Sequence, residues 1–444
     1  MNTGPARGMR DFLPEDVRRR QYVIGAIADV YQKYGFEPLE TPAVENLETL
    51  RGKYGEEGDR LIFKILKRGE GADTGQADLA LRYDVTVPLA RVVAEYRSKL
   101  PKFFKRYQVQ PVWRADRPQK GRFREFFQCD IDAIGSTSMT VEAELLSAAA
   151  DVFLALGFRD FHIVVNHRKL LNAVLRQAGV PGELQGPVLV IMDKADKIGV
   201  DGVRRELGEK GLSDAVATDL LGQLSGTPPA DLVAWMDERS AVLNDDGKAG
   251  IEELRQIFAL SKATSAGPHL RLDRSLARGL SYYTGPIFEV RVADLAGSMG
   301  GGGRYDNLIG MFSGESIPAS GISLGLERIL VVMAERKMFP ESVVSTPADV
   351  MVVQWFANRT ELYLGLASEL RKGGLRVELY PESPAEDGRK VGDRQFKYAS
   401  ARGIPYVAVI GADELANNTV TVKNMKTGEQ HTMARAETVT WLNS

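Results

Sequence analysis

The sequence predicts an α+β domain that is interrupted by a helical insert and followed by a small α/β domain. Short strand-like segments, among them 60–66, 79–84 and 161–166, characterise the first part of the chain. From about residue 180 to about residue 265 the pattern changes to amphipathic helical pieces, and a strand pattern returns at 281–293. The C-terminal part alternates strand and helix, which is typical of a mostly parallel sheet with covering helices.

The length of 444 residues leaves room for two or three domains with real cores. We expect residues 340–349, which contain two prolines and two serines, to be the linker. The expected segments are 1–180 and 266–339 for the two parts of the α+β domain, 181–265 for the helical insert and 346–444 for the α/β domain.

Composition and charge favour an ordinary globular enzyme of the cytoplasm. Hydrophobic residues make up 44% and charged residues 26%, and the formal net charge of −2 gives no overall attraction to nucleic acid or membrane. The single cysteine, Cys129, excludes a disulfide framework, and the four histidines lie apart in the sequence. We expect no membrane association, because no apolar run is long enough to span a bilayer and no apolar signal core follows the N-terminus.

The first domain should begin with a helix at 14–34. Pro14 suits a first helical turn, an apolar stripe recurs at helical spacing, and Gly35 ends the pattern. Residues 36–45 read as an extended segment, and a helix at 141–156 precedes the strand at 161–166. In the C-terminal domain we expect strands at 349–355, 376–381, 406–411 and 419–425 and helices at 358–372 and 393–402.

Residues 113–128 concentrate positive charge on one predicted hairpin. The stretch WRADRPQKGRFREFFQ holds four arginines and a lysine against two acids, with aromatic residues between the charges and a turn at 118–121. One interpretation is a solvated ribbon whose alternate aromatic side chains pack beneath it. The other is a site for a nucleotide triphosphate, because guanidinium forks fit phosphate oxygens and an aromatic ring can stack on a base.

Three further stretches could carry chemistry, although each has an ordinary structural interpretation. Arg278 precedes Tyr282 and Tyr283, and taken alone it could be an exposed arginine at a strand edge. Gly300–Gly303 could be a flexible turn, or a backbone that passes close to a ligand or another strand. Arg328 stands in the first turn of an apolar helix, where a surface arginine is common.

Together these stretches resemble a known family. In order, the segments RGMRDFLPED, GFEPLETPAVE, LALRYDVTVPLAR, WRADRPQKGRFREFFQCDIDAIG, VNHRKLL, LARGLSYYTG, GGGRYDNL and GISLGLERI are similar to the signature segments of histidyl-tRNA synthetase, a class II aminoacyl-tRNA synthetase. The C-terminal domain resembles that family's anticodon-binding domain. The resemblance covers nearly the whole chain and implies a catalytic domain built on an antiparallel sheet flanked by helices.

The resemblance implies an ATP site on the hairpin. Arg114 would contact the α-phosphate and the carboxylate of the amino acid, and Asp116 would lie near the adenine or the ribose. Arg122 would lie near the outer phosphates, Phe126 would stack on the adenine, and Arg328 would hold the γ-phosphate.

Arg278 matches the family's histidine-specific arginine at the α-phosphate. Arg278, Arg114 and Arg328 are therefore the expected catalytic residues, and their cationic side chains with Mg²⁺ would stabilise the transferring phosphoryl group. The protein itself is expected to supply no metal site.

The resemblance also implies a histidine site. Asp132 and Tyr282 would hold the imidazole, and Tyr283 and the Gly300–Gly303 strand would form the wall of the pocket. Ser281 departs from the family, which usually has Asp there, and Asp84 and Asp132 are shorter than the Glu of many bacterial members. The full expected histidine-binding set is Asp84, Thr86, Arg114, Gln128, Asp132, Arg278, Tyr282 and Tyr283.

The implied activity is ligation of histidine to tRNA(His) through a histidyl-adenylate, with ATP as substrate and pyrophosphate as product. The implied partners are L-histidine, ATP, tRNA(His) and a second copy of the chain. Two alternatives stay open: a synthetase-like regulatory subunit of ATP phosphoribosyltransferase, and a synthetase-like domain that senses uncharged tRNA. The C-terminal domain and the presence of Arg114, Arg278 and Arg328 speak against the first alternative, and these three arginines speak against the second.

Overall fold

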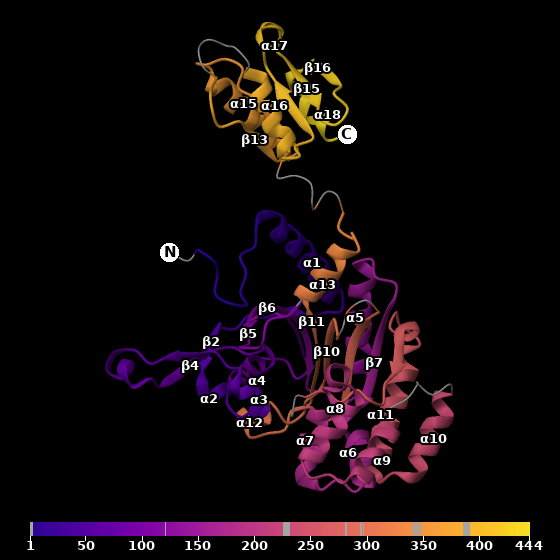
Figure 1. Ribbon diagram of the computed structural model, residues 1–444. Coiled ribbons are helices and arrows are strands. Elements are labelled where there is room, and N and C mark those ends of the chain that lie inside the picture. Colours follow the sequence, from indigo (N-terminus) through magenta and orange to yellow (C-terminus); the bar gives the residue numbers. More distant parts are fainter. Residues whose placement is uncertain are drawn as a thin grey trace. The chain divides into compact units, whose positions relative to one another are not determined.

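The structure is a computed structural model, and it describes residues 3–119, 121–224, 231–279, 282–293, 295, 297–340, 343, 348–384 and 391–444. The chain divides into two compact units, Met1–Met338 and Phe339–Ser444. Figure 1 traces both units along the chain, and each is described here by itself.

An eight-stranded mixed sheet forms the centre of the first unit. Its order is β1-β5-β6-β11-β10-β9-β7-β8. The six inner strands are antiparallel to their neighbours, whereas β1 and β8 at the two edges are parallel to theirs. The strands are β1 (Glu37–Pro38), β5 (Phe104–Trp113), β6 (Glu125–Ile134), β7 (Phe161–His167), β8 (Leu270–Leu272), β9 (Pro286–Val292), β10 (Gly300–Arg304) and β11 (Ala319–Gly325).

The parallel edges differ from the wholly antiparallel sheet that the sequence predicted. Parallel neighbours need a long crossover connection, and both edge strands have one. The chain makes a smaller sheet and several helices between β1 and β5, and it makes the helical insert between β7 and β8. Because β7 pairs with both β8 and β9, the helical residues between them are an insertion into one continuous sheet.

Three helices cover one face of this sheet: α1 (Pro14–Lys33), α5 (Thr140–Ala155) and α13 (Leu326–Glu335), which lie together along it in Figure 1. The predicted helices at 14–34 and 141–156 are confirmed. The apolar stripe of α1 is buried, and the hydroxyl of Tyr31 donates to the carbonyl of Cys129 at 3.2 Å. The guanidinium carbon of Arg20 on α1 lies 4.6 Å from the ring centre of Phe127, so the odd-numbered residues of β6 face the helices and the even-numbered residues point to the other face.

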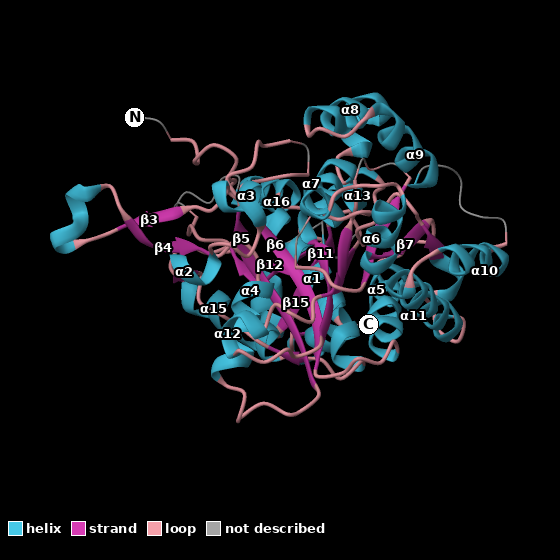
Figure 2. Cartoon of the chain, turned by 90° about the horizontal axis from the view of Figure 1, so that it is seen from below, coloured by secondary structure: helices cyan, strands magenta, loops and turns pink. Residues whose placement is uncertain are grey.

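A smaller antiparallel sheet, β2-β4-β3, projects from the first unit, as both Figure 1 and Figure 2 show. Its strands are β2 (Val44–Asn46), β3 (Lys64–Leu66) and β4 (Ala77–Leu81), with α2 (Leu47–Leu50), α3 (Gly55–Arg60) and η1 (Gly69–Thr74) beside them. The strands predicted at 60–66 and 79–84 are both shorter. Residue 60 belongs to α3, and the ladder ends before Arg82, whose guanidinium binds the carbonyls of Thr41 and Pro111.

The helical insert follows β7. The last helix of the insert, α11, packs against α6. The imidazole Nε2 of His167 lies 2.7 Å from a carboxylate oxygen of Glu253 on α11. No helix in the described ranges is long and apolar enough to span a bilayer. The helices here are α6 (Arg168–Gln177), α7 (Gly182–Met192), α8 (Ala195–Glu209), α9 (Asp214–Leu224), α10 (Leu232–Val242) and α11 (Asp245–Ser261), followed by η2 (Gly267–His269). The remaining helices of the unit are α4 (Thr86–Glu95) and α12 (Gly310–Ser313).

The second unit has a five-stranded sheet of order β13-β12-β14-β15-β16. The first three strands are parallel, and the last two are antiparallel, so the sheet is less parallel than predicted. Its elements are β12 (Val350–Val352), α15 (Thr360–Lys372), β13 (Val377–Leu379), α16 (Val391–Ala401), β14 (Tyr406–Val409), α17 (Ala412–Asn417), β15 (Thr419–Asn424), β16 (Gln430–Ala434), η3 (Arg435–Glu437) and α18 (Thr438–Leu442).

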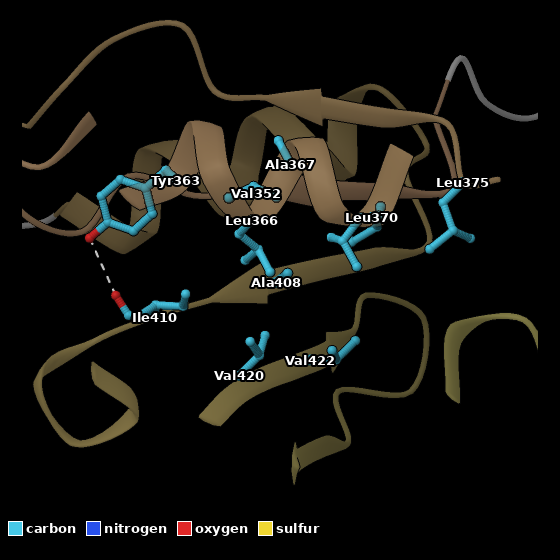
Figure 3. Close-up of a cluster of buried hydrophobic side chains, with 11 residues drawn as sticks. Val352, Tyr363, Leu366, Ala367, Leu370, Leu375, Ala408, Ile410, Val420 and Val422 are labelled. Atoms are coloured by element: carbon cyan, nitrogen blue, oxygen red, sulfur yellow. Dashed lines mark hydrogen bonds between the residues drawn. The ribbon is translucent and has the colours of Figure 1, made fainter. Parts of the chain in front are cut away.

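The core of the second unit lies between α15 and the sheet. Leu366 and Leu370 of α15 face the strands, and the hydroxyl of Tyr363 donates to the carbonyl of Ile410 at 3.3 Å (Figure 3). The edge strand β16 was not predicted. Its sequence QHTMA is polar and mostly exposed, so it lacks the apolar alternation by which a half-buried strand is recognised.

Candidate active site

A buried polar face on β5 and β6 forms the floor of the candidate site. Side chains alternate along a strand, so the even-numbered residues of these two strands point away from α1, α5 and α13. Arg106 and Gln108 of β5 lie beside Asp132 and Asp130 of β6 in the ladder, and Gln128 follows on β6. All five side chains are 7% exposed or less. Such a row of polar groups is unusual in the middle of a sheet and has to be explained by its partners.

Asp132 is held by two protein groups. The hydroxyl of Tyr305 donates to its Oδ1, and the guanidinium of Arg106 lies 2.9 Å from its Oδ2. Burial raises the pKa of Asp132, whereas Arg106 and the Tyr305 hydroxyl oppose that rise. Asp132 Oδ2 has this ion pair but accepts no hydrogen bond of good geometry among the described residues, so a further N–H donor could bind there.

Asp130 also has an open oxygen, because its Oδ1 has no hydrogen-bond partner among the described residues. Burial raises its pKa to about 8, against the lowering effect of Arg106, and the neighbouring charge of Asp132 adds to the rise. The group therefore holds its proton at pH values at which an exposed carboxyl group has lost it.

Other acceptors around this floor are also open. Gln128 donates through Nε2 to Ser323 at 2.9 Å, but its Oε1 has no partner in the described structure, and neither does Gln108 Oε1. Asp84 accepts from the Tyr54 hydroxyl at 3.0 Å and from the Val87 amide at 2.9 Å through Oδ1, while its Oδ2 is open. Buried acceptors without donors are costly, and their clustering suits a ligand that brings several N–H groups.

The start of α4 contributes to the same place. Asp84 comes just before this helix, and Thr86 is its first residue and 8% exposed. The guanidinium of Arg106 donates to the carbonyl of Val85 at 3.2 Å, which fixes the start of α4 above the sheet. Burial raises the pKa of Asp84, although Val87, Arg114 and Tyr54 oppose the rise.

The predicted hairpin is confirmed as β5 and β6, and it places Arg114 next to this floor. Arg114 donates through Nε to the carbonyl of Tyr83 at 3.0 Å, and its guanidinium carbon lies 4.4 Å from the Tyr83 ring centre and 5.1 Å from that of Phe126. Asp116 accepts through its backbone carbonyl from Arg124 at 3.1 Å. Phe126 is half-buried, so part of its ring remains open.

The turn of the hairpin approaches α13. A side chain added at Gly121 would contact Arg328, which lies in the first turn of that helix and donates through Nη1 to the carbonyl of Ser298. The pKa of Arg328 is lowered by burial and by the positive charges of Arg122 and Arg278. Three guanidinium groups that repel one another within one partly buried site indicate that an anion binds there.

Arg278 lies over the glycine strand β10. A side chain at Gly301 would collide with the Arg278 guanidinium, and one at Gly303 would lie 2.8 Å from the Tyr283 ring. Gly301 and Gly303 therefore let these side chains lie flat on the backbone of the sheet. Arg278 also donates to Glu289 of β9 at 2.9 Å. Burial acts to lower the pKa of Arg278, but Tyr283 and Glu289 outweigh it and leave that pKa raised.

The two tyrosines connect the acidic and the basic parts. The rings of Tyr282 and Tyr283 lie 4.9 Å apart, and the Tyr282 ring lies 6.0 Å from that of Tyr305, which holds Asp132. Burial raises the pKa of Tyr282 well above its ordinary value, Tyr283 and Asp84 add to the rise, and Arg278 and Arg114 oppose it. One buried site thus combines open acceptors on one side with guanidinium groups on the other.

Comparison with known proteins agrees with this arrangement. A family model of histidyl-tRNA synthetase matches residues 8–329, and a model of an anticodon-binding domain matches residues 349–444. The chain belongs to the histidyl-tRNA synthetase family. The resemblance seen in the sequence is therefore confirmed.

Individual members of the histidyl-tRNA synthetase family match over nearly the full length. The chain is 42% identical to the histidine–tRNA ligase of Flavobacterium johnsoniae and 44% identical to that of Porphyromonas gingivalis, in each case over 96% of this chain and 95% of the relative. The crystal structure of histidyl-tRNA synthetase from Nostoc sp. PCC 7120 superposes with a TM-score of 0.83 at 30% identity, covering 100% of this chain and 99% of that one. The class II synthetase fold is thereby confirmed.

Several residues of the buried site described above were not predicted from the sequence: Arg106, Gln108, Asp130, Glu289 and Tyr305. A signal for the floor existed, because polar residues recur with period two along both 106–110 and 128–132. Lys120 and Ser281, which the sequence singled out, lie outside the described residues. No group of three or more His, Cys, Asp or Glu side chains within the described ranges is arranged to hold a metal ion.

The second unit of this family member carries basic residues on α16 and β15. Arg394 pairs with Glu382 at 3.1 Å, and Arg402 lies 3.4 Å from Glu378. Lys423 lies 5.1 Å from the ring centre of Phe396. Arg389 and Lys390, which share this part of the sequence, lie outside the described residues.

Proposed function

We propose that this protein ligates histidine to tRNA(His) in two steps. Histidine reacts with ATP to give histidyl-adenylate and pyrophosphate, and the histidyl group then passes to the 3′ end of the tRNA. The observation that carries the proposal is the pairing, in one buried site, of open acceptors at Asp84, Gln128 and Asp130 with the guanidinium groups of Arg114 and Arg278. Histidine carries N–H groups that need acceptors, and the triphosphate of ATP needs positive charge. The reaction between them therefore needs both parts of the site.

The acceptor half would bind the ammonium and imidazole groups of histidine. We assign the ammonium group to Asp84, Gln128 and the start of α4 at Thr86, because Asp84 Oδ2 and Gln128 Oε1 lack donors in the described structure. For the imidazole, Tyr282 and Asp132 form one side. A ligand of similar shape but without these N–H groups would leave buried acceptors unpaired, which is the strongest known source of discrimination.

We add Asp130 to the histidine-binding set. Its open Oδ1 lies on the same sheet face as Asp132 and two residues away along β6. The wall of this pocket is Tyr283, whose ring lies against Gly303 of the glycine strand.

The basic half would bind ATP. Arg122 and Arg328 would bind the outer phosphates, and Arg114 and Arg278 would bind the α-phosphate. Phe126 would stack on the adenine, and Asp116 would lie near the adenine or the ribose. ATP would enter as its magnesium complex, and its phosphates would supply ligands for Mg²⁺. This Mg²⁺ is substrate, and its chemistry is to neutralise phosphate charge.

The first step needs positioning more than proton transfer. A carboxylate oxygen of histidine attacks the α-phosphorus, and the bond to the bridging oxygen breaks, so pyrophosphate leaves with that electron pair. Charge spreads over the phosphoryl oxygens on the way, and the guanidinium groups of Arg114 and Arg278 stabilise it there. Since guanidinium groups stay charged at neutral pH, these residues act as fixed positive charges.

We propose that residues 346–444 bind the anticodon part of the tRNA, and that residues 1–180 and 266–339 form the catalytic domain with the helical insert 181–265 between them. We also propose a cytoplasmic homodimer. In support, Leu13 before α1 and Val44 on β2 are exposed apolar side chains within or beside the first signature segment, at 70% and 38% exposure. Sedimentation at micromolar concentration tests the dimer, and a stable, active monomer would contradict it.

Histidine-dependent exchange of pyrophosphate into ATP tests the proposed activity. The enzyme should catalyse exchange with histidine, and equal exchange with glutamine or phenylalanine would remove the specificity. Absence of exchange would favour either of the two non-catalytic alternatives. Charging of tRNA(His) with labelled histidine then tests the second step.

A further inference from the structure

The segment that carries Arg278 is held by two side chains at the end of β7. Asn166, which is fully buried, donates through Nδ2 to the carbonyls of Arg274 at 3.0 Å and Leu276 at 2.9 Å. Arg168, the first residue of α6, donates through Nη1 to the carbonyls of Ala277 at 3.3 Å and Arg278 at 3.4 Å. Four carbonyls of this segment thus have donors from one short stretch of chain.

The far end of the segment is tied to the same stretch. The backbone amide of Arg168 donates to the carbonyl of Gly285 at 2.9 Å, immediately before β9 pairs with β7. Arg274 and Gly285, at the two ends of this segment, are therefore both held next to the end of β7, by Asn166 and Arg168.

Arg278 needs such support because its backbone is strained. Its φ of +50° lies in the left-handed region, which a residue with a long side chain adopts only where its surroundings impose it. In this conformation its guanidinium reaches over Gly301 to Glu289. A relaxed backbone at residue 278 would point the side chain elsewhere.

The helical insert also contacts the segment that carries Arg278. Asp193, directly after α7, lies so close to Gly279 that a side chain there would come within 3.0 Å of its carboxylate. Its negative charge favours the charged forms of both Arg168 and Arg278. Met192 and Asp193 of the insert and residues 275–277 also line a pocket of about 40 Å³.

We propose that Asn166 and Arg168 are positioning residues for adenylation, which fix the strained backbone of Arg278 and thereby the place of its guanidinium, and that Asp193 links the insert to this clamp. The inference rests on the proposed function, in which Arg278 stabilises the α-phosphate. The clamp contacts the proposed site only through the backbone carbonyl of Arg278, so its loss should lower turnover much more than it weakens histidine binding.

The test uses the full-length protein and histidine-dependent pyrophosphate exchange. Arg168→Met should lower kcat by about 10- to 100-fold, the size expected for a catalytic group displaced by about 1 Å, with KM for histidine within about threefold of wild type. Arg168→Lys should recover little, because one ammonium group cannot reproduce the guanidinium fork. Arg176→Met, on the exposed face of the same helix where Arg176 pairs with Asp246, is the matched control and should keep wild-type turnover.

A double-mutant cycle with Arg278→Ala separates positioning from a general structural effect. If Arg168 acts through Arg278, Arg168→Met should cause almost no further loss of kcat in the Arg278→Ala background. A loss of the same size in both backgrounds, or near wild-type kcat of Arg168→Met alone, would overturn the proposal. If Arg168→Met does not fold by circular dichroism, the same cycle with Arg168→Lys decides. Wild-type turnover of Arg278→Ala itself would instead refute the role of Arg278 in the proposed function, and with it the clamp.

Discussion

Asp130 allows a sharp prediction, because one substitution should stabilise the protein and impair it at once. The carboxyl group is buried on the sheet with Oδ1 open, and burial raises its pKa to about 8. Replacing it by the isosteric asparagine removes the charge that folding must desolvate. The amide keeps an acceptor oxygen for the Ser323 hydroxyl that interacts with this group.

The sign follows from proton linkage. The folded state keeps the Asp130 proton from the ordinary pKa of 3.8 up to about 8, whereas the unfolded chain loses it near the ordinary value. Unfolding in this range releases a proton, so the free energy of unfolding falls as pH rises through the range and is lowest above it. The whole difference corresponds to about 6 kcal/mol, because each pKa step of one is worth about 1.4 kcal/mol.

We expect a smaller gain than this in practice. Asp130 and Asp132 share the charge of Arg106, so removing one carboxylate lets Arg106 pair more fully with the other. A gain of about 2 kcal/mol above pH 8 would raise Tm by about 3 °C in a unit that spans Met1–Met338. The gain should shrink steadily as pH is lowered toward 5.

The assay is thermal unfolding of the ligand-free wild type and Asp130→Asn between pH 5 and pH 9, with Asp78→Asn as control. Asp78 is an exposed residue of β4, so folding does not desolvate it and its substitution should leave the pH dependence of Tm unchanged. In the same Asp130→Asn preparation, KM for histidine in pyrophosphate exchange should rise about tenfold, as expected when one charged hydrogen bond is lost. A lower Tm at pH 8.5, or a pH profile identical to wild type, would refute the reasoning.

Two further substitutions and one truncation test the remaining structure. Arg304→Met should destabilise the first unit by about 3–5 kcal/mol in denaturant unfolding, because it leaves the fully buried carboxylate of Glu142 without a partner. In the wild type, Arg304 donates to the two oxygens of Glu142 at 2.9 and 3.0 Å. A loss of stability below about 1 kcal/mol would contradict this prediction. Gly301→Ala should lower kcat of exchange by about 100-fold, because the added methyl group occupies the place of the Arg278 guanidinium, and it should also lower Tm, because that methyl group would lie 2.9 Å from the Phe288 carbonyl oxygen; unchanged turnover would show that Arg278 does not need this place. Removal of residues 345–444 should preserve exchange but raise KM for tRNA strongly, and full-length charging kinetics in the truncated protein would remove the anticodon-binding role.

The sequence predicted helices with strong periodicity well and strand limits less well. The helix expected at 14–34 is Pro14–Lys33, because a proline start, a buried stripe and a following glycine act together. The strand expected from residue 281 begins at Pro286. Tyr282 and Tyr283 have strand-like composition but lie outside the ladder, and the contact of the Tyr283 ring with the glycine strand leaves no trace in local propensity.

For the candidate site, the sequence located the arginines and left out half of the floor. Arg114, Arg278 and Arg328 stand in distinctive motifs. Arg106 and Asp130 alternate with apolar residues on strands, and a period of two fixes which residues share a face without fixing whether that face is core or site. Only the pairing of β5 with β6 and the position of α1 show that this polar row is buried opposite the helices.

The open acceptors, the neighbouring guanidinium groups and the left-handed backbone of Arg278 each cost folding free energy, and in the proposed reaction a substrate group relieves the first two. Open acceptors at Asp84 and Asp130 lack donors that an ammonium or imidazole group would supply. The charges of Arg122 and Arg278 lower the pKa of Arg328, and a triphosphate would reverse that effect. The left-handed backbone of Arg278 is compensated within the protein itself, by the donors of the β7 clamp, since its guanidinium must be in place before ATP arrives. In the proposed function, the unsatisfied groups therefore receive substrate groups, and the compensated strain at Arg278 keeps its guanidinium in a fixed position.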